Sequence, residues 1–193
     1  MKRFIKKNLK KMITKNYTTP MHANFQQRMT KKTKLFHIGS ISPLTQKNNA
    51  DFLFNSIEAL CELGFFISIL AEGDLESQKK CFHFAKKYPY QFKILESIPQ
   101  NQEKILQSSN IIVFTNEPKK EDLKQIIKNG IVPIMPYNKK FIEFDPQQEK
   151  GNSFLFQENN FWQFLASIIR ASENFKFSYD WKNLQKNVKA MVL

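Results

Sequence analysis

Three side chains that could contact an anionic ligand each follow a short apolar run of this chain. They are Lys47, Asp74 and Glu117, which follow the apolar runs 35–41, 65–71 and 110–115. Such runs, too short for a buried helix, are typical of strands covered on both faces of a parallel sheet. Ligands of these sheets bind beyond the carboxyl ends of the strands. The turns that carry the three side chains are therefore the first candidates for a site.

Taken singly, each candidate also has a simpler interpretation. A lone lysine in a turn is usually solvated, and a Glu-Gly-Asp turn is common without any function. The charged residues 119–122 match the ordinary preference of a first helical turn for acidic side chains. The choice between these interpretations depends on the elements that position the turns.

The stretch 109–136 predicts a strand, a helix and a second strand. Residues 119–129 have helical spacing at Leu123, Ile126 and Ile127, and Gly130 fits the left-handed position just after a helix. The apolar run 131–135 follows and is closed by Pro136. Two buried strands joined by a crossover helix indicate a parallel sheet, with the turn 115–120 at its carboxyl edge.

The rest of the chain repeats this alternation, which predicts a doubly wound, Rossmann-like α/β domain with a parallel sheet. Further strands are expected at 92–95 and, at an edge, 154–156. Helices are expected at 49–63, 75–88, 99–107, 158–175 and 179–192. The apolar face of the 158–175 helix is expected to hold Phe161, Trp162, Leu165, Ile168 and Ile169.

The net charge of +13 is concentrated at the N-terminus. Residues 1–34 hold eleven basic and no acidic side chains, whereas the other 159 residues hold nineteen basic and seventeen acidic ones. We therefore divide the chain into a basic arm or linker, 1–33, expected to be poorly ordered, and a domain, 34–193. The arm is interpreted as a solvated tail, a polyanion contact on RNA or an anionic membrane, or a targeting peptide.

Several classes of site are disfavoured by the residues themselves. Neither GxGxxG nor GxxxxGK[ST] occurs, and the three histidines, His22, His37 and His83, lack neighbours at metal-ligand spacing. Cys61 and Cys81 are expected to be buried free thiols. No apolar run reaches the length of a transmembrane helix. We expect a cytoplasmic protein with no metal and no cofactor.

Five segments in order resemble the starch and glycogen synthases. Residues 38–47 (IGSISPLTQK) are similar to the family's ISRLTxQKG, and 70–74 (LAEGD) to its LGSGD. Residues 117–134 (EPKKEDLKQIIKNGIVPI) align without a gap on EPCGLTQLEAMRYGTVPI. Residues 151–156 (GNSFLF) resemble ATGFLF, and Trp181 and Leu184 match the terminal WxxLxxxAM helix. The resemblance implies the C-terminal, nucleotide-sugar-binding half of a GT-B glycosyltransferase.

The resemblance also implies roles for individual residues. Lys47 and Glu117 would be catalytic: Lys47 neutralises the donor diphosphate and Glu117 contacts the donor. Asp74, Lys120, Glu121 and Gln125 complete the implied donor site, with backbone amides of the helix start receiving phosphate. The sequence departs from the family at Pro43, which replaces an arginine, at Gln125, which replaces a glutamate, and at Lys119-Lys120, which replace Cys-Gly.

The implied substrate is ADP-glucose or UDP-glucose. A chain of this length accommodates one such domain, so we expect a separate GT-B N-terminal domain as partner. The chain is then a fragment, a subunit of a split enzyme, or a non-catalytic descendant with an altered donor site. The alternative is a non-enzymatic binding or scaffold protein that uses its basic arm on RNA, an anionic membrane or an acidic partner.

Overall fold

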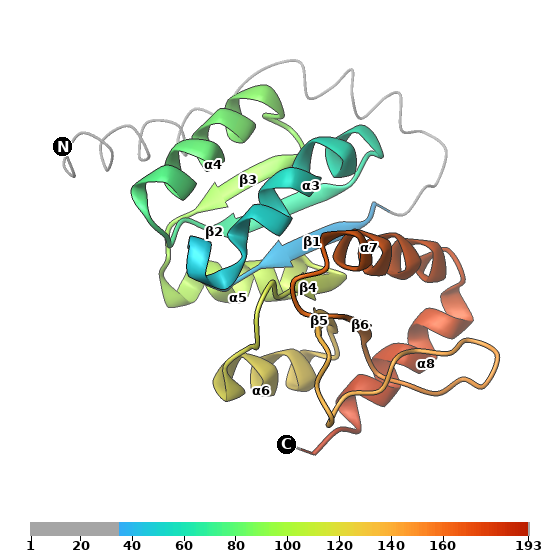
Figure 1. The fold of residues 1–193 in the computed structure, drawn as a ribbon. Coiled ribbons are helices and arrows are strands. Elements are labelled where there is room, and N and C mark those ends of the chain that lie inside the picture. The colour runs from blue at the N-terminus through green and yellow to red at the C-terminus, as the bar shows by residue number, and fades with distance from the viewer. Residues whose placement is uncertain (1–34, 193) are drawn as a thin grey trace. The chain divides into compact units, whose positions relative to one another are not determined.

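A sheet of six parallel strands lies at the centre of the structure, a computed structural model that describes residues 35–192 (Figure 1). The strands are β1 (His37–Ser40), β2 (Phe66–Leu70), β3 (Phe92–Leu95), β4 (Ile111–Val113), β5 (Val132–Pro136) and β6 (Phe154–Phe156). Their spatial order is β3-β2-β1-β4-β5-β6. This is the order of a doubly wound fold, so the predicted fold class is confirmed.

Helices cover both faces of the sheet. They are α3 (Ala50–Glu62), α4 (Leu75–Lys87), α5 (Pro99–Ser108), α6 (Lys120–Asn129), α7 (Phe161–Phe175) and α8 (Ser178–Lys189). Figure 1 shows α3, α4 and α7 above the sheet and α5, α6 and α8 below it. A short 3-10 helix, η1 (Gln46–Asn48), lies between β1 and α3.

The central strands are apolar because both of their faces are covered. Ile67, Ile38, Ile111 and Val132 are all fully buried, and they lie in register across β2, β1, β4 and β5. Below the sheet, Ile105 of α5 and Ile126 of α6 join one apolar cluster with strand residues. This packing fixes the strand ends, and therefore the loops that follow them.

Local signals set the helix ends. Gly130 ends α6 in the left-handed conformation with φ of 65°, which confirms its predicted role as a C-cap. The Asn160 side chain accepts a hydrogen bond from Gln163 N at 3.0 Å and caps α7. The predicted elements are all present: the strands 92–95 and 154–156 have the predicted ends, and the ends of the other elements are displaced by at most three residues.

One prediction about α7 is wrong. Trp162 was expected on the apolar face, but its side chain is 74% exposed, whereas Phe164 is fully buried. The capping bond places the first turn so that Phe164, rather than Trp162, faces the sheet and contacts Phe52 and Phe156. The predicted basic arm, 1–33, lies outside the described residues, so its boundary with the domain stays a prediction.

Candidate functional site

The three candidate turns meet where the strand order reverses. From β1 the chain winds outward through β2 to β3, and it then returns to β4, on the opposite side of β1. The loops after β1 and β4 are therefore neighbours, while their helices α3 and α6 lie on opposite faces of the sheet (Figure 1). This topological switch point is where doubly wound folds bind their ligands.

Asn48 joins the loop after β1 to the loop after β4. Its backbone carbonyl accepts a hydrogen bond from the buried Thr115 hydroxyl, and its side-chain Oδ1 accepts one from Asn116 Nδ2 at 3.3 Å. Its Nδ2 donates to Pro43 O at 3.0 Å and closes its own loop. Asn48 thus fixes Lys47, its neighbour in η1, beside the turn that carries Glu117. Sequence reasoning missed Asn48, because its partners are 67 and 68 residues away.

The loop after β2 is held against the same loop. Leu44 N donates to Glu72 O at 2.7 Å, and Leu44 forms an isolated parallel bridge with Gly73. A Cβ on Gly73 would overlap the Leu44 carbonyl, so the close approach depends on glycine. Three loops, after β2, β1 and β4, thus form one connected edge.

Lys47 and Glu117 are both exposed on this edge. Among the described residues neither side chain forms a hydrogen bond or an ion pair, and the same holds for the side chains of Lys120 and Glu121 at the start of α6. The N-cap of α6, Lys119, has no side-chain hydrogen bond to the helix. The first N–H groups of α6 therefore lack a side-chain acceptor and can meet an anion.

Asp74 is committed to a structural contact. Its carboxylate accepts a hydrogen bond from Ser77 N at 2.8 Å and caps α4. This bond, helped by backbone N–H groups including that of Gln46, lowers the pKa of the Asp74 carboxyl below its ordinary value. Asp74 thus lies at the predicted edge, where its carboxylate caps α4 and lies near the backbone of Gln46, in the loop that carries Lys47.

Gln125 lies farther along α6, against α5. Its Oε1 accepts a hydrogen bond from Gln102 Nε2 at 3.3 Å, and Asp122 Oδ1 accepts from the same nitrogen at 3.4 Å. Burial raises the pKa of the half-buried Asp122 carboxyl, and the nearby Glu121 and Glu72 carboxylates act in the same direction. The structure therefore brings the loops of Lys47, Asp74 and Glu117 together, whereas Gln125 contacts α5.

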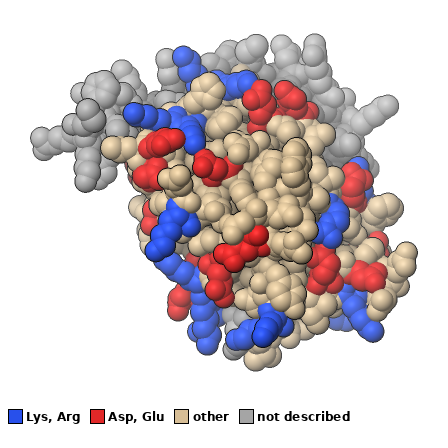
Figure 2. All heavy atoms as spheres, in the orientation of Figure 1, with Lys and Arg blue, Asp and Glu red and all other residues tan. Residues whose placement is uncertain are grey.

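Charge on the viewed face is mixed. Figure 2 shows acidic and basic side chains interspersed around an uncharged central area, with no extended patch of one sign. This matches the nearly balanced composition of the domain, and it distinguishes the domain from the basic segment 1–34. Within residues 35–192 there is no group of three or more potential metal ligands and no helix that could span a membrane.

A second feature of the carboxyl edge was not predicted from the sequence. An open pocket of about 530 Å³ lies where β5 and β6 end. It is lined by Pro136, Tyr137, Leu155, Phe156, Gln157, Glu158 and Gln163. The one sequence signal was Tyr137, an aromatic residue directly after the strand-closing Pro136.

Comparison with known proteins agrees with this geometry. No family model matches the chain. The chain is 26% identical over 133 residues to the glycogen synthase of Mycoplasma mobile. The match covers 65% of this chain and 28% of that protein. The resemblance to starch and glycogen synthases is therefore also found by whole-sequence comparison.

Solved structures have the same fold. The catalytic domain of starch synthase IV from Arabidopsis thaliana, bound to ADP and acarbose, superposes with a TM-score of 0.71 at 17% identity over 89% of this chain and 38% of that one. The C-terminal domain of a group 1 glycosyl transferase (LpcC) from Francisella tularensis gives 0.59 at 14% identity, over 85% and 88%. The fold is that of a GT-B glycosyltransferase domain, and the chain spans well under half of the two synthases.

Proposed function

We propose that this domain is the donor-binding half of a starch or glycogen synthase-like glycosyltransferase, with ADP-glucose or UDP-glucose as its ligand. The observation that carries the proposal is the hydrogen bonding of Asn48 to Thr115 and Asn116, which holds Lys47 and Glu117 at one switch point. The similarity to a glycogen synthase and the fold shared with an ADP-bound starch synthase support the same ligand class.

Each residue has a role that its chemistry allows. The Lys47 ammonium would neutralise charge on the donor diphosphate, which leaves with the nucleotide. The uncapped N–H groups at the start of α6 would donate hydrogen bonds to a phosphate. Glu117, at the same edge, would accept hydrogen bonds from donor hydroxyl groups.

The donor site is altered, and we propose that lysines compensate for part of the change. Pro43 supplies no charge where the family has arginine. Pro43 is half-buried, and its backbone carbonyl accepts a hydrogen bond from the Asn48 side chain. Lys119 and Lys120 are exposed at the start of α6 and add positive charge beside the proposed phosphate position. Turnover would also require an acceptor-binding half, which residues 35–192 do not contain.

The proposal is tested by calorimetric titration of the chain with ADP-glucose and with UDP-glucose. We expect saturable heat with one of the two donors, and a loss of that heat in Lys47→Ala and in Glu117→Ala. Both side chains are exposed and have no protein partner among the described residues, so neither substitution should affect folding. The absence of heat and of any thermal shift at about 5 mM of either donor would refute donor binding.

A second candidate function rests on the charge distribution in the sequence. Residues 1–34 carry +11, and the rest of the chain carries +2. We therefore also propose that the N-terminal segment binds a polyanion such as RNA or an anionic membrane. Deleting residues 1–33 should then abolish salt-sensitive binding to RNA and to anionic vesicles. Unchanged binding after the deletion would reject this role.

A further inference from the structure

The exposed face of α8 carries one aromatic and three basic side chains in a row. They are Tyr179, Lys182, Lys186 and Lys189, and steps of three or four residues keep them within about 80° of one another around the helix. All four side chains are exposed, whereas the opposite face of α8, which holds Trp181, is buried against the domain. We call this row the lysine ridge.

The charge of the lysine ridge is not balanced on its own helix. The one acidic residue of α8, Asp180, lies about 100° or more around the helix from each member of the ridge. Glu149, from the loop before β6, accepts a hydrogen bond from the Tyr179 hydroxyl at 3.4 Å. From Lys182 to Lys189 the helix rises by about 10 Å. Three positive charges therefore lie along a short line, with a tethered aromatic ring at one end.

The end of α6 adds a fourth charge to the ridge. α8 packs against α6 below the sheet (Figure 1), and the stem of Lys189 lies over Gly130, where a Cβ would overlap it. Lys128 precedes Gly130 by two residues and is exposed. The start of α6, which belongs to the proposed donor site, lies about 15 Å away along the helix. The ridge is therefore a separate surface.

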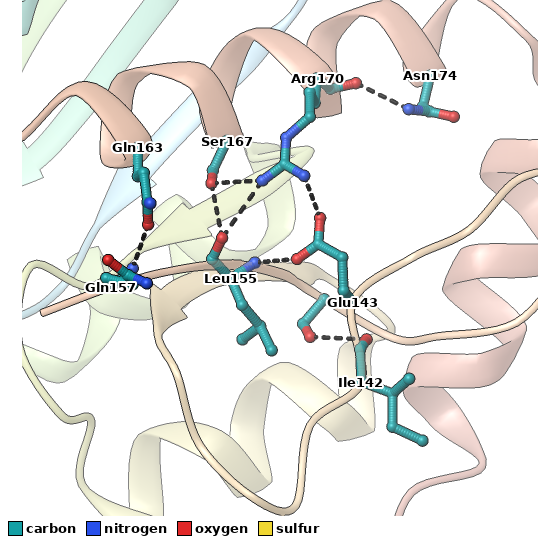
Figure 3. Close-up of polar contacts among 9 residues, drawn as sticks. Ile142, Glu143, Leu155, Gln157, Gln163, Ser167, Arg170 and Asn174 are labelled. Carbon is teal, nitrogen blue, oxygen red and sulfur yellow. Dashed lines mark hydrogen bonds and ion pairs between the residues drawn. The ribbon is translucent and has the colours of Figure 1, made fainter. Parts of the chain in front are cut away.

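The lysines of the ridge are free, whereas other cations of the domain are already paired. Arg170, the one arginine within residues 35–192, forms an ion pair with Glu143 at 2.6 Å and donates to Leu155 O at 3.3 Å (Figure 3). Among the described residues, the side chains of the ridge lysines and of Lys128 form no hydrogen bond and no ion pair. Three further lysines are paired with carboxylates: Lys80, Lys87 and Lys176.

This combination fits a strand of phosphates with unpaired bases. Lysine ammonium groups bind phosphates as point charges, and about 10 Å corresponds to about three nucleotides at roughly 3.4 Å each. The ridge has no bulky aliphatic side chain to insert into a bilayer, which disfavours a membrane, whereas the exposed Tyr179 offers a ring on which a base can stack. Unpaired bases are typical of RNA loops and ends.

We propose that the lysine ridge of α8 binds the phosphate backbone of single-stranded RNA, with Tyr179 stacking on a base. Lys128 extends the basic surface beyond Lys189. The proposal rests on the folded domain alone, so it depends neither on the donor site nor on the basic segment 1–34.

The test measures binding of a fluorescent oligouridylate of about 20 nucleotides to the full chain by anisotropy, at several salt concentrations. The triple variant Lys182→Gln/Lys186→Gln/Lys189→Gln should weaken binding at least roughly tenfold at about 0.1 M salt. The slope of log affinity against log salt should become shallower by about 2, because three phosphate contacts are lost at about 0.7 each. The arginine triple at the same positions keeps the charges and should bind like the wild type.

The matched control removes three charges elsewhere. Lys79, Lys86 and Lys139 are exposed, lie outside α6 and α8, and have no side-chain partner among the described residues. Their glutamine triple has the same net charge as the ridge variant and should keep the affinity and the salt slope of the wild type. All six positions are exposed, so both variants should fold, which urea denaturation checks.

A second pair of variants tests the aromatic contact. Tyr179→Ala removes the ring and should weaken RNA binding roughly fivefold, because one stacked base is lost. Tyr179→Phe keeps the ring without its hydroxyl and should bind like the wild type. Equal affinity of the alanine variant and the wild type would remove the stacking part of the proposal.

The outcomes separate the ridge from the other proposals. Equal losses in the two glutamine triples, or an unchanged salt slope in the ridge variant, would overturn the ridge. Loss of binding to phosphatidylserine vesicles with unchanged RNA binding would assign the ridge to a membrane and overturn the RNA proposal. Loss in the ridge variant without loss after deletion of residues 1–33 supports the ridge and rejects the role of the N-terminal segment. The reverse pattern rejects the ridge, and donor titration is independent of both.

Discussion

The buried Thr115 hydroxyl donates a hydrogen bond to the backbone carbonyl of Asn48 and thereby joins two loops that are far apart in the sequence. Lys47 lies beside Asn48, and Glu117 lies two residues after Thr115. The proposed donor site therefore depends on a contact that is neither charged nor exposed. Its removal should affect ligand binding without altering a residue that touches the ligand.

Thr115→Val tests this dependence. The substitution keeps the shape of the side chain and leaves the Asn48 carbonyl without its donor, which should cost about 1–3 kcal/mol of unfolding free energy. Donor affinity should fall as the two loops lose their fixed separation. Urea denaturation and donor titration measure the two effects. Thr45→Val is the control, because the Thr45 side chain makes no capping hydrogen bond at η1. Equal losses of stability and of donor affinity in the two variants would contradict the account.

Gly73→Ala should be more damaging than Gly64→Ala. A Cβ on Gly73 would overlap the backbone carbonyl of Leu44, so the loops after β1 and β2 must separate, at a cost of roughly 2–3 kcal/mol. Gly64 has a φ of 84° but open space around it, so alanine there adds only backbone strain of about 1 kcal/mol. Chemical denaturation of both variants gives the comparison. A smaller loss at Gly73 than at Gly64 would show that the loop contact is not constrained.

The compensation by lysine predicts a charge effect at one end of α6. The double variant Lys119→Ala/Lys120→Ala should weaken donor binding by roughly fivefold at low salt, and the difference should shrink as salt is added. Lys124 and Lys128 are also exposed on α6 but lie farther from its start, so their double alanine variant is the matched control. Equal effects of the two double variants would indicate general attraction rather than local neutralisation.

His37 makes stability depend on pH. Burial lowers the pKa of the His37 imidazole below its ordinary value of 6.5, and nearby Lys93 adds to the effect, while the ring stacks on Phe66. The folded state thus favours the neutral ring. Below about pH 6.5 the unfolded chain binds more protons, so unfolding free energy should fall as pH falls through the folded pKa.

His37→Phe should flatten this dependence between about pH 7.5 and 5.5, because phenylalanine keeps the stacking and cannot be protonated. Urea denaturation at several pH values measures it. His83→Phe, on the exposed side of α4, is the matched control. An unchanged pH slope in His37→Phe would assign the dependence to other groups.

Local patterns in the sequence predicted the elements well for a physical reason. The strand Phe92–Leu95 was located without error, and α6 began one residue later than expected, because apolar spacing, Pro99 and Gly130 act within a few residues. Trp162 was misplaced: it lies two residues before the buried Phe164, about 200° around the helix, and the apolar residues of this segment do not by themselves show which of the two faces the sheet. Local patterns did not predict the side chains that join the loops at the carboxyl edge of the sheet. The bonds of Asn48 and the lining of the pocket depend on strand order and loop path, which no local pattern contains.

The most direct test of the donor site is a map of backbone amide shifts during titration with ADP-glucose and with UDP-glucose. We predict shifts confined to two regions, 43–49 and 115–121, growing together to saturation with one donor. The same map for Glu117→Ala should lose both sets, while the signals of β3 and α4 remain those of the folded wild type. Shifts that avoid both regions, or no shifts at about 5 mM of either donor, would contradict donor binding at the switch point.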